Sequence, residues 1–480
     1  MRAFTMEFTH TINGLAVSSE GDFEVIDPAT ARGFARCPDA TREQLDQAVA
    51  AARRAFGQWR RTPAAERGEY VRAFAAALRA SATRLAPLLT QEQGKPLAAA
   101  TSEFLRSADH IDVLSTIDIG GELLRSGGRD KVELHYRPLG VVGAITPWNF
   151  PVVLAVWKIA HAIYTGNTVV LKPSPYTPLT TLKLGELARG ILPPGVLNVL
   201  AGGNDLGAWM SEHPGIDKIS FTGSGPTGKK VLRSASSSLK RVTLELGGND
   251  AAIVLPDVDI PKAAQDIFWG AFNNSGQICK AIKRIYVHED IYAPMGNALA
   301  AIARATKVGS GMEPGVQLGP VQNRAQFDIV NALIDDARRQ GGEFLSGGEP
   351  LPLPGYFIPP TIVSGLGKGS RLVEEEPFGP VVPLIRYVSV DDALDQANDT
   401  AFGLSGSIWT VDIEQGRALA ARLEVGTAWV NQHGGSDPHL PFGGAKASGM
   451  GHENALLGLR DYMQLSVVQS PPDPSAPAAK

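Results

Sequence analysis

Apolar residues recur at helical spacing in the early part of the chain. Thr41 and Gln44 form a capping-box pattern, and the apolar side chains that follow lie three or four residues apart, on one helix face. These side chains are Leu45, Val49, Ala52, Phe56 and Trp59. A second helix is expected to begin near Thr62 and Pro63. The early chain is therefore predicted to be mainly helical.

From Val141 onward, short β-branched runs end at proline, glycine or serine and alternate with helix-compatible stretches. Four of these runs carry polar residues at their ends: VVGAIT before PWNF, TVVLK before Pro173, KISFT before GSG, and VTLEL before Gly247. Ligands bind beyond the carboxyl ends of strands in open parallel sheets, so these ends are candidate sites. AIVL at 252–255 and TAWVN at 427–431 repeat the pattern and predict a second α/β domain.

Two segments differ from this pattern. The stretch LLRSGGRDKVELHYRPLG, just before Val141, has a glycine-containing turn and alternating polar and apolar residues, which is typical of an exposed hairpin. Such a hairpin leaves strand edges unpaired in a monomer and is a candidate for association between subunits. The C-terminal QSPPDPSAPAAK is rich in proline and is expected to be extended or disordered.

Composition adds limits on the class of protein. The chain has 480 residues, too many for one hydrophobic core, so at least two domains are expected. Apolar residues make up 44%, charged residues 20%, and the formal net charge is −4, so neither disorder nor a nucleic-acid-binding surface is indicated. The longest apolar candidate for a membrane span, residues 151–163, contains Lys158 and His161. We expect neither a nucleic acid nor a membrane as a partner.

The two cysteines, Cys37 and Cys279, are too few for a disulfide framework, and no secretory signal is apparent, so a cytoplasmic location is expected. Cys279 follows a Gly-Gln turn in FNNSGQICKAIKR and precedes the strand-like run RIYVH, a position that can expose a nucleophile. Lys280, Lys283 and Arg284 would favour its thiolate if their charges point toward it. Without further context, a lone cysteine is more often a small buried apolar residue.

Polar residues at three strand ends could take part in chemistry. Glu245 precedes two glycines and could act as a general base, although such a glutamate is often solvated or a helix-cap partner. Asn149, in TPWNFP, could donate to a developing oxyanion or merely stabilise a turn. The chain lacks a GxGxxG motif, but FTGSGPTG at 221–228 could bring backbone N–H groups and a hydroxyl of Gly223 and Ser224 to a pyrophosphate. By itself, such a segment is more often only a turn.

The motifs PWNFP, KPS, FTGS, LELGG, GQIC, EEPFGP and PFGGAKASGMG occur in the order that aldehyde dehydrogenases show, and the chain resembles that family from the first helices to about Tyr462. The resemblance implies an α/β fold with a Rossmann-type NAD(P)-binding domain (1–118 and 139–247) and an α/β catalytic domain (248–444). A small β-hairpin oligomerisation element and tail (119–138 and 462–480) would complete it. A homodimer or homotetramer is implied.

The resemblance also implies the chemistry. Cys279 would be the nucleophile, Glu245 the general base, and Asn149 would join the Cys279 backbone N–H in an oxyanion hole. The thiolate would add to an aldehyde, hydride would pass to NAD(P), and water would release a carboxylic acid from the thioester. Two alternatives stay open: a CoA-acylating relative, against which Glu245 argues, and a non-enzymatic protein that retains the fold.

A cofactor site is implied in the same way. Lys172 would bind the adenosine ribose, Glu376 the nicotinamide ribose, and Phe378 would pack beside the nicotinamide. The other positions carried over are Trp148, Ser174, Gly202, Gly207, Gly223 and Ser224. This chain has Pro175 where many NAD-preferring members have glutamate, so we expect NAD and leave NADP open.

The implied aldehyde channel is apolar except at one position. Its residues are Phe150, Leu154, Trp157, Ile278 and Phe442, although Leu154 and Ile278 could equally be core. An apolar channel favours an aromatic or medium aliphatic aldehyde. Lys280 stands where the family usually has a small or apolar residue. It could turn into solvent, lower the pKa of Cys279, or meet an anionic group of the substrate.

Three histidines lie near the late motifs but do not suggest a metal. His433, His439 and His452 form no pair with metal-ligand spacing to cysteine or acidic partners. A solitary histidine near a substrate entrance is more often a rim residue than a catalyst. No metal site is therefore expected.

Overall fold

The computed structural model describes residues 7–126, 130–435 and 437–471. The first helix, α1 (Arg42–Trp59), begins at the predicted capping box: the Gln44 backbone N–H donates to the Thr41 hydroxyl at 3.2 Å, and the Thr41 N–H donates to the Gln44 side chain at 3.0 Å. The helices α2 (Ala64–Gln93) and α3 (Leu97–Leu114) follow, the former directly after Pro63. The helical predictions for this region are confirmed.

The first sheet has five parallel strands at its centre. Their spatial order is β9 (Leu197–Val199), β8 (Thr168–Lys172), β7 (Val141–Ile145), β10 (Lys218–Thr222) and β11 (Arg241–Glu245). The short strands β1 (His10–Ile12) and β2 (Leu15–Val17) extend one edge, and β21 (Gly449–Met450) pairs with β11 at the other. The strand order reverses between β7 and β10, and a reversal of this kind opens a ligand-binding crevice at the carboxyl ends of the strands.

Alternate residues of each central strand pack on opposite layers of helices. Val142 and Ala144 of β7 face the layer formed by α2, α3, α4 (Pro151–Tyr164) and α5 (Leu179–Ala188). Val141 and Ile145 face α1, α6 (Asn204–Glu212) and α7 (Gly225–Ser236). This two-sided burial explains why the strands read as continuous apolar runs.

The second sheet is parallel except for one edge strand, β14. Its order is β14 (Glu343–Ser346), β15 (Thr361–Ser364), β16 (Val381–Tyr387), β13 (Ile282–His288), β12 (Asp250–Val254), β18 (Ser405–Trp409) and β19 (Thr427–Val430). The helices α8 (Ile260–Phe272) and α9 (Tyr292–Ala305) cover one face. The other face packs on α10 (Arg324–Arg339), α12 (Val390–Asn398) and α13 (Ile413–Ala420). The α/β fold class is confirmed.

The remaining elements are short or lie at the periphery. They are β3 (Asp22–Asp27), β4 (Arg32–Pro38), η1 (Asn273–Gly276), η2 (Glu289–Ile291), α11 (Arg371–Glu374), β17 (Phe402–Gly403), β20 (Ala445–Lys446) and α14 (Ala455–Arg460). The strands β1 to β4 were not predicted from the sequence. No helix within the described ranges is long and apolar enough to cross a membrane.

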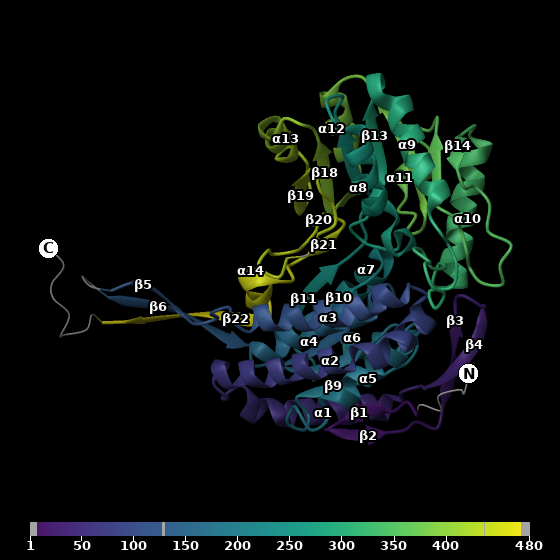
Figure 1. The fold of residues 1–480 in the computed structure, drawn as a ribbon. Coiled ribbons are helices and arrows are strands. Elements are labelled where there is room, and N and C mark those ends of the chain that lie inside the picture. Colours follow the sequence, from purple (N-terminus) through teal and green to yellow (C-terminus); the bar gives the residue numbers. More distant parts are fainter. Residues whose placement is uncertain (1–6, 127–129, 436, 472–480) are drawn as a thin grey trace.

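A third sheet forms an arm that projects from the body of the molecule (Figure 1). The predicted hairpin provides β5 (Glu122–Arg125) and β6 (Lys131–Pro138), which pair antiparallel. A third strand, β22 (Met463–Ser470), pairs with β6 along its whole length, so the first two residues of the predicted extended tail end a strand. Residues 127–129 of the hairpin turn and 472–480 of the tail lie outside the described residues. The domain boundaries and the role of the arm in association stay predictions.

Candidate active site

The backbone places Cys279 between the two sheets. After α8, the residues Asn274 and Ser275 adopt positive φ angles of 52° and 55°, and the Ser275 hydroxyl donates to the Gly319 carbonyl at 2.7 Å. The chain then passes through Cys279 and enters β13. The predicted position between a helix and a strand is confirmed, and the thiol is half-buried.

Cys279 lies in an apolar cluster that contains three of the five residues assigned to the aldehyde channel. The cluster is formed by Val153, Leu154, Trp157, Leu404, Phe442 and Cys279. Phe150 and Ile278 are half-buried and do not belong to it. The Phe150 ring instead lies under the Lys95 ammonium, 4.0 Å from the ring centroid to Nζ.

Burial outweighs the nearby positive charges at the Cys279 thiol. Burial raises the pKa of Cys279 to about 11, although Lys283 and Lys280 act to lower it and Glu245 and Glu376 add to the rise. Lys283 forms an ion pair with Glu376 at 3.0 Å and also donates to the Cys279 carbonyl. The neutral thiol is therefore the stable form near pH 7, and the expected stabilisation of the thiolate is only partial.

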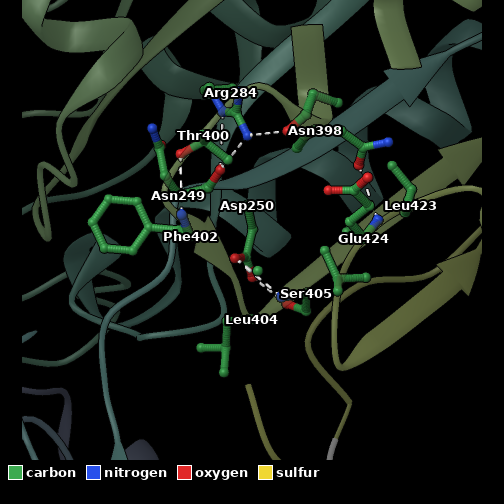
Figure 2. Close-up of a pocket in the computed structure, with 15 residues that line it drawn as sticks. Asn249, Asp250, Arg284, Asn398, Thr400, Phe402, Leu404, Ser405, Leu423 and Glu424 are labelled. Carbon is green, nitrogen blue, oxygen red and sulfur yellow. Dashed lines mark hydrogen bonds between the residues drawn. The ribbon is translucent and has the colours of Figure 1, made fainter. Parts of the chain in front are cut away.

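The Arg284 guanidinium is turned away from the thiol. Its Nε and Nη2 donate to the Asn249 carbonyl at 2.9 and 2.7 Å, and it lines the pocket that Figure 2 shows. Leu404 borders this pocket and also packs on Cys279, so it separates the two spaces. The expectation that Arg284 favours the thiolate is not met, because its charge is committed to backbone carbonyls.

Asn149 is buried beside the Cys279 loop. Its Nδ2 donates to the Gln277 carbonyl at 2.9 Å, and its own backbone carbonyl accepts from Lys95 Nζ at 3.0 Å and from Asn274 Nδ2 at 3.2 Å. A primary amide has two N–H donors, so one stays available. None of the hydrogen bonds among the described residues uses the Cys279 backbone N–H. Two donors near the thiol are thus uncommitted.

Glu245 ends β11 as a buried carboxyl group. Its strand register pairs it with Thr222 of β10 and Gly449 of β21. Neither side-chain oxygen has a hydrogen-bond partner among the described residues. Burial raises the pKa of Glu245 well above its usual value, and the negative charge of Glu453 adds to the effect. A carboxyl group in this condition is a stronger base than a solvated one.

The pattern of the sequence did not reveal two buried ion pairs that support these residues. Lys158 binds Glu453 at 2.7 Å close to Glu245, and Lys95 pairs with Glu103 close to Asn149. Glu103 also accepts from the backbone N–H groups of Val152 and Val153 at 2.9 and 3.1 Å and so caps α4. A charged residue at a core-facing helix position was the available signal: Glu103 follows Ala100 and precedes Phe104 on α3.

At the other end of the crevice, Lys172 and the predicted glycines lie together. The buried Lys172 ammonium donates to the Pro173 carbonyl at 3.1 Å, and burial lowers its pKa to about 8. Gly207 lies against the Lys172 side chain, because a Cβ atom added to this glycine would be 3.8 Å from it. Gly202 lies against Asp39, because a Cβ atom added there would be 3.1 Å from the Asp39 carboxylate. The negative charge of Asp39 also acts on Lys172. Asp39 was not among the residues that the sequence predicted for this site.

The turn after β10 has the predicted form but not all of the predicted donors. FTGSGPTG joins β10 to α7, with Ser224 as the N-cap residue. The Gly223 N–H donates to the Glu245 carbonyl at 3.0 Å, so it is not available to a phosphate, which corrects the expectation for this group. The Ser224 hydroxyl donates to Thr227 at 3.0 Å, and Ser174 accepts from the Tyr176 N–H at 3.2 Å.

Trp148, Glu376 and Phe378 lie near the Cys279 end of the crevice. The Trp148 and Phe378 rings meet edge to face with centroids 5.3 Å apart, and Phe378 has a φ of 44°. Glu376 accepts from the Gly248 N–H at 3.1 Å and pairs with Lys283. The described structure therefore connects the implied cofactor residue Glu376 with the Cys279 loop.

Lys280 does not turn into solvent. It is half-buried, its Nζ donates to the Gly435 carbonyl at 2.7 Å, and the ammonium lies 5.1 Å from the Phe442 ring centroid. His433 donates from Nε2 to the Lys280 carbonyl at 2.9 Å, and burial lowers the pKa of His433 to about 3. His433 thus supports the loop as a neutral residue.

Known proteins resemble this chain over nearly its whole length. Residues 16–468 match the model of the aldehyde dehydrogenase family. An aldehyde dehydrogenase from a Fusarium species is 39% identical over 469 residues, covering 96% of this chain and 99% of the relative. Betaine aldehyde dehydrogenase 1 of Oryza sativa subsp. japonica is 38% identical, covering 92% and 91%.

Solved structures show the same fold. The betaine aldehyde dehydrogenase of Staphylococcus aureus in complex with NAD+ superposes with a TM-score of 0.94 at 31% identity, covering 99% of this chain and 97% of that one. A mutant aldehyde dehydrogenase of Bacillus cereus gives a TM-score of 0.94 at 35% identity, with 97% of each chain covered. The resemblance inferred from the motifs is confirmed, and this chain belongs to the aldehyde dehydrogenase family.

Proposed function

We propose that this protein oxidises an aldehyde to a carboxylic acid with NAD, through a thioester on Cys279. The observation that carries the proposal is the grouping of three side chains: a half-buried thiol, a buried carboxyl group without a partner, and an amide with a free N–H donor. Each is a group that this reaction needs, and they come from three distant parts of the chain. The charge of Glu245 acts on the Cys279 thiol, and Asn149 donates to Gln277 in the Cys279 loop, which supports one shared site.

Cys279 is the nucleophile. Because burial holds its pKa near 11, the thiol must lose its proton as it attacks, and Glu245, a buried carboxyl group whose charge acts on this thiol, is the proposed base. The Sγ–C bond forms on the aldehyde carbonyl, whose oxygen takes up the negative charge. The Asn149 amide and the Cys279 backbone N–H are the two uncommitted donors that stabilise it.

The residues present fit a bound NAD. The buried Lys172 ammonium has only the Pro173 carbonyl as its acceptor, which leaves donors for ribose hydroxyls. Gly247 lies directly against the Glu376 carboxylate, and a Cβ atom at this position would collide with the carboxylate. This part of the crevice is therefore narrow. When bound, NAD supplies the hydride acceptor that converts the thiohemiacetal to the thioester. Lys172, Ser224, Glu376, Phe378 and Trp148 would hold it.

NAD is the favoured cofactor over NADP. Asp39 places a negative charge near Lys172, where a 2′-phosphate would be repelled. The S. aureus neighbour was solved with NAD+, which supports the same choice. Pro175 does not restore affinity for an extra phosphate because it offers no donor.

Glu245 completes the reaction by activating water. Once Glu245 has released the thiol proton to solvent, its carboxylate accepts a proton of water as the oxygen attacks the thioester, and the Cys279 sulfur leaves as the thiolate. The product is a free acid and not an acyl-CoA. The apolar cluster around the thiol supports an aromatic or medium aliphatic aldehyde, since burial of apolar surface contributes about 25 cal/mol per Å².

An aldehyde panel tests the proposal directly. Purified protein is incubated with aromatic and aliphatic aldehydes and with NAD or NADP, each with and without CoA, while absorbance of the reduced cofactor is followed. We expect turnover with NAD in the absence of CoA and none in Cys279→Ser. A strict need for CoA would favour the acylating alternative, and no reduction with any aldehyde would leave the non-enzymatic one.

A further inference from the structure

Lys280 holds a positive charge at the edge of the apolar cluster around Cys279. Its ammonium lies 5.1 Å from the Phe442 ring centroid and 5.9 Å from that of Trp429. Its hydrogen bond to Gly435 uses one of three N–H donors. Lys280 forms no ion pair with any residue of the described chain. The charge is therefore half-buried without an anion.

A second cation, Arg106, lies close enough to Lys280 for its charge to act on that residue. Arg106 is exposed on α3, its charge acts on both Lys280 and Lys95, and the described residues include no ion-pair partner for it. His110, one helical turn after Arg106, stacks on the Trp157 ring with centroids 5.3 Å apart. Because Trp157 and Phe442 are in contact, His110 of α3 and Lys280 pack on the same pair of aromatic rings, and Arg106 lies one helical turn before His110.

We propose that Lys280, assisted by Arg106, binds a carboxylate at the far end of the aldehyde substrate, so that the preferred substrates are aldehydes with an apolar body and a terminal carboxylate. This inference rests on the proposed aldehyde oxidation. The aromatic walls enclose the body of the substrate, while the two cations meet its anionic end. A charge-assisted hydrogen bond to a half-buried ammonium is stronger than one in water.

The other cations nearby cannot serve this purpose. Lys95 is neutralised by Glu103 and Lys283 by Glu376, whereas Lys280 and Arg106 have no such partner in the described part of the chain. Asp250 is the acidic group whose charge reaches Lys280, but it is bonded to Ser405 in the pocket behind Leu404. A cationic aldehyde such as betaine aldehyde would meet like charge at this rim.

Three benzaldehydes that differ only in the para group test the inference. The probes are 4-carboxybenzaldehyde, 4-methylbenzaldehyde and 4-(trimethylammonio)benzaldehyde, and kcat/KM is measured for each with NAD. We expect the carboxylate to exceed the methyl compound about 10- to 100-fold, the range for a hydrogen bond to a charged group. The ammonium compound is expected to be the poorest.

Variants separate the anion contact from the effect of Lys280 on the Cys279 thiol. Lys280→Met raises the pKa of Cys279 for every substrate, so a common loss is expected, but the preference for the carboxylate should fall about tenfold or more. Lys280→Arg should keep the preference and Arg106→Gln should reduce it several-fold. Lys262→Met removes an exposed lysine on α8 and is the matched control.

Each outcome decides one of the two proposals. If all three aldehydes are oxidised alike, or if Lys280→Met slows them by the same factor, the carboxylate contact is wrong while aldehyde oxidation stands. If no aldehyde is oxidised, the proposed function is wrong, and calorimetry with terephthalate and 4-methylbenzoate decides the contact. Tighter binding of terephthalate that is lost in Lys280→Met supports it, and equal binding overturns it.

Discussion

At the scale of single residues, the reactivity of Cys279 is set by two opposing effects. Burial disfavours the thiolate, and the charges of Lys283 and Lys280 favour it, but burial is the larger effect and the pKa rises to about 11. At pH 7 the thiolate fraction is therefore ~10⁻⁴. The position suits a nucleophile that is deprotonated only when its base is in place.

This balance predicts the pH dependence of alkylation. The reactive thiolate is the deprotonated form, so a raised pKa means that the rate of reaction with iodoacetamide should grow about tenfold per pH unit from pH 7 to 10. Lys283→Met should raise the pKa further and slow alkylation at every pH in this window. Mass spectrometry of the modified peptide measures both rates.

Cys37 provides the internal control for this experiment. It is fully buried, and burial raises its pKa above that of Cys279, so it should stay unmodified in the folded protein. A rate that is already constant above pH 7 would show that Cys279 is ionised at rest, contrary to the balance of burial and charge.

Glu245→Gln should separate the two halves of the reaction. Glutamine keeps the shape of the side chain but cannot accept the proton of water, so kcat should fall about 10²- to 10⁴-fold. If the thiol can still lose its proton to solvent, one equivalent of reduced cofactor per subunit should appear as a burst at high pH, with acylated Cys279 detected by mass spectrometry. Steady turnover at the wild-type rate would exclude Glu245 as the base.

At the scale of elements, α3 fixes the start of α4 and with it Asn149. The Glu103 carboxylate accepts from two N–H groups of the first turn of α4 and pairs with Lys95, which in turn donates to the Asn149 carbonyl. Pro151 stands at the first position of α4 and has no N–H group that needs an acceptor. The Glu103 carboxylate accepts from the N–H groups that follow, so the first backbone donors of α4 are satisfied. Asn149 is thereby held although it lies in a loop.

Removing Glu103 should weaken both the fold and the site. Glu103→Ala leaves the buried Lys95 ammonium without its counter-ion and two N–H groups of α4 without an acceptor, which costs about 3–5 kcal/mol. The melting temperature should fall by several degrees and kcat by more than the loss of folded protein explains. The double variant Lys95→Met with Glu103→Gln removes the lone charge and should recover part of the stability. No recovery would argue that packing, and not charge, dominates here.

The elements that sequence predicted are those with strong local patterns. The strands β7 and β8 are short β-branched runs buried on both faces, and α1 carries a complete capping box. The strands β1 and β2 have only three residues each, too few for a periodic pattern to emerge. They pair with each other across the Asn13-Gly14 turn, and β1 alone also pairs with β9, more than 180 residues later.

At the scale of the whole molecule, the arm of β5, β6 and β22 presents apolar side chains to solvent. Leu123, Leu124 and Val467 are exposed by 58%, 58% and 60%. Such side chains on a sheet with open edges are typical of a surface that is covered in an assembly. We therefore predict that the protein is a homodimer or homotetramer through this arm.

Charge on the arm should disrupt the assembly. In Val467→Asp with Leu123→Asp, burial of two carboxylates in a subunit interface would be unfavourable, so light scattering should show a smaller particle than the wild type. Leu239→Asp is the matched control, because Leu239 is 90% exposed on the body of the protein and should leave the mass unchanged. A wild-type protein that is monomeric at micromolar concentration would contradict the assigned role of the arm.

The sequence by itself determined the family, the alternation of strands and helices, and the identity of the candidate residues, because these depend on local pattern and on motifs of adjacent residues. Only the tertiary structure decided which charges reach the thiol. Lys280, Lys283 and Arg284 are almost adjacent in sequence, yet Arg284 faces away and Lys280 meets the aromatic wall. Glu453 raises the pKa of Glu245, Asp39 acts on Lys172, and Glu103 pairs with Lys95. The contacts of Glu453 and Asp39 join distant parts of the chain, so no local pattern contains them.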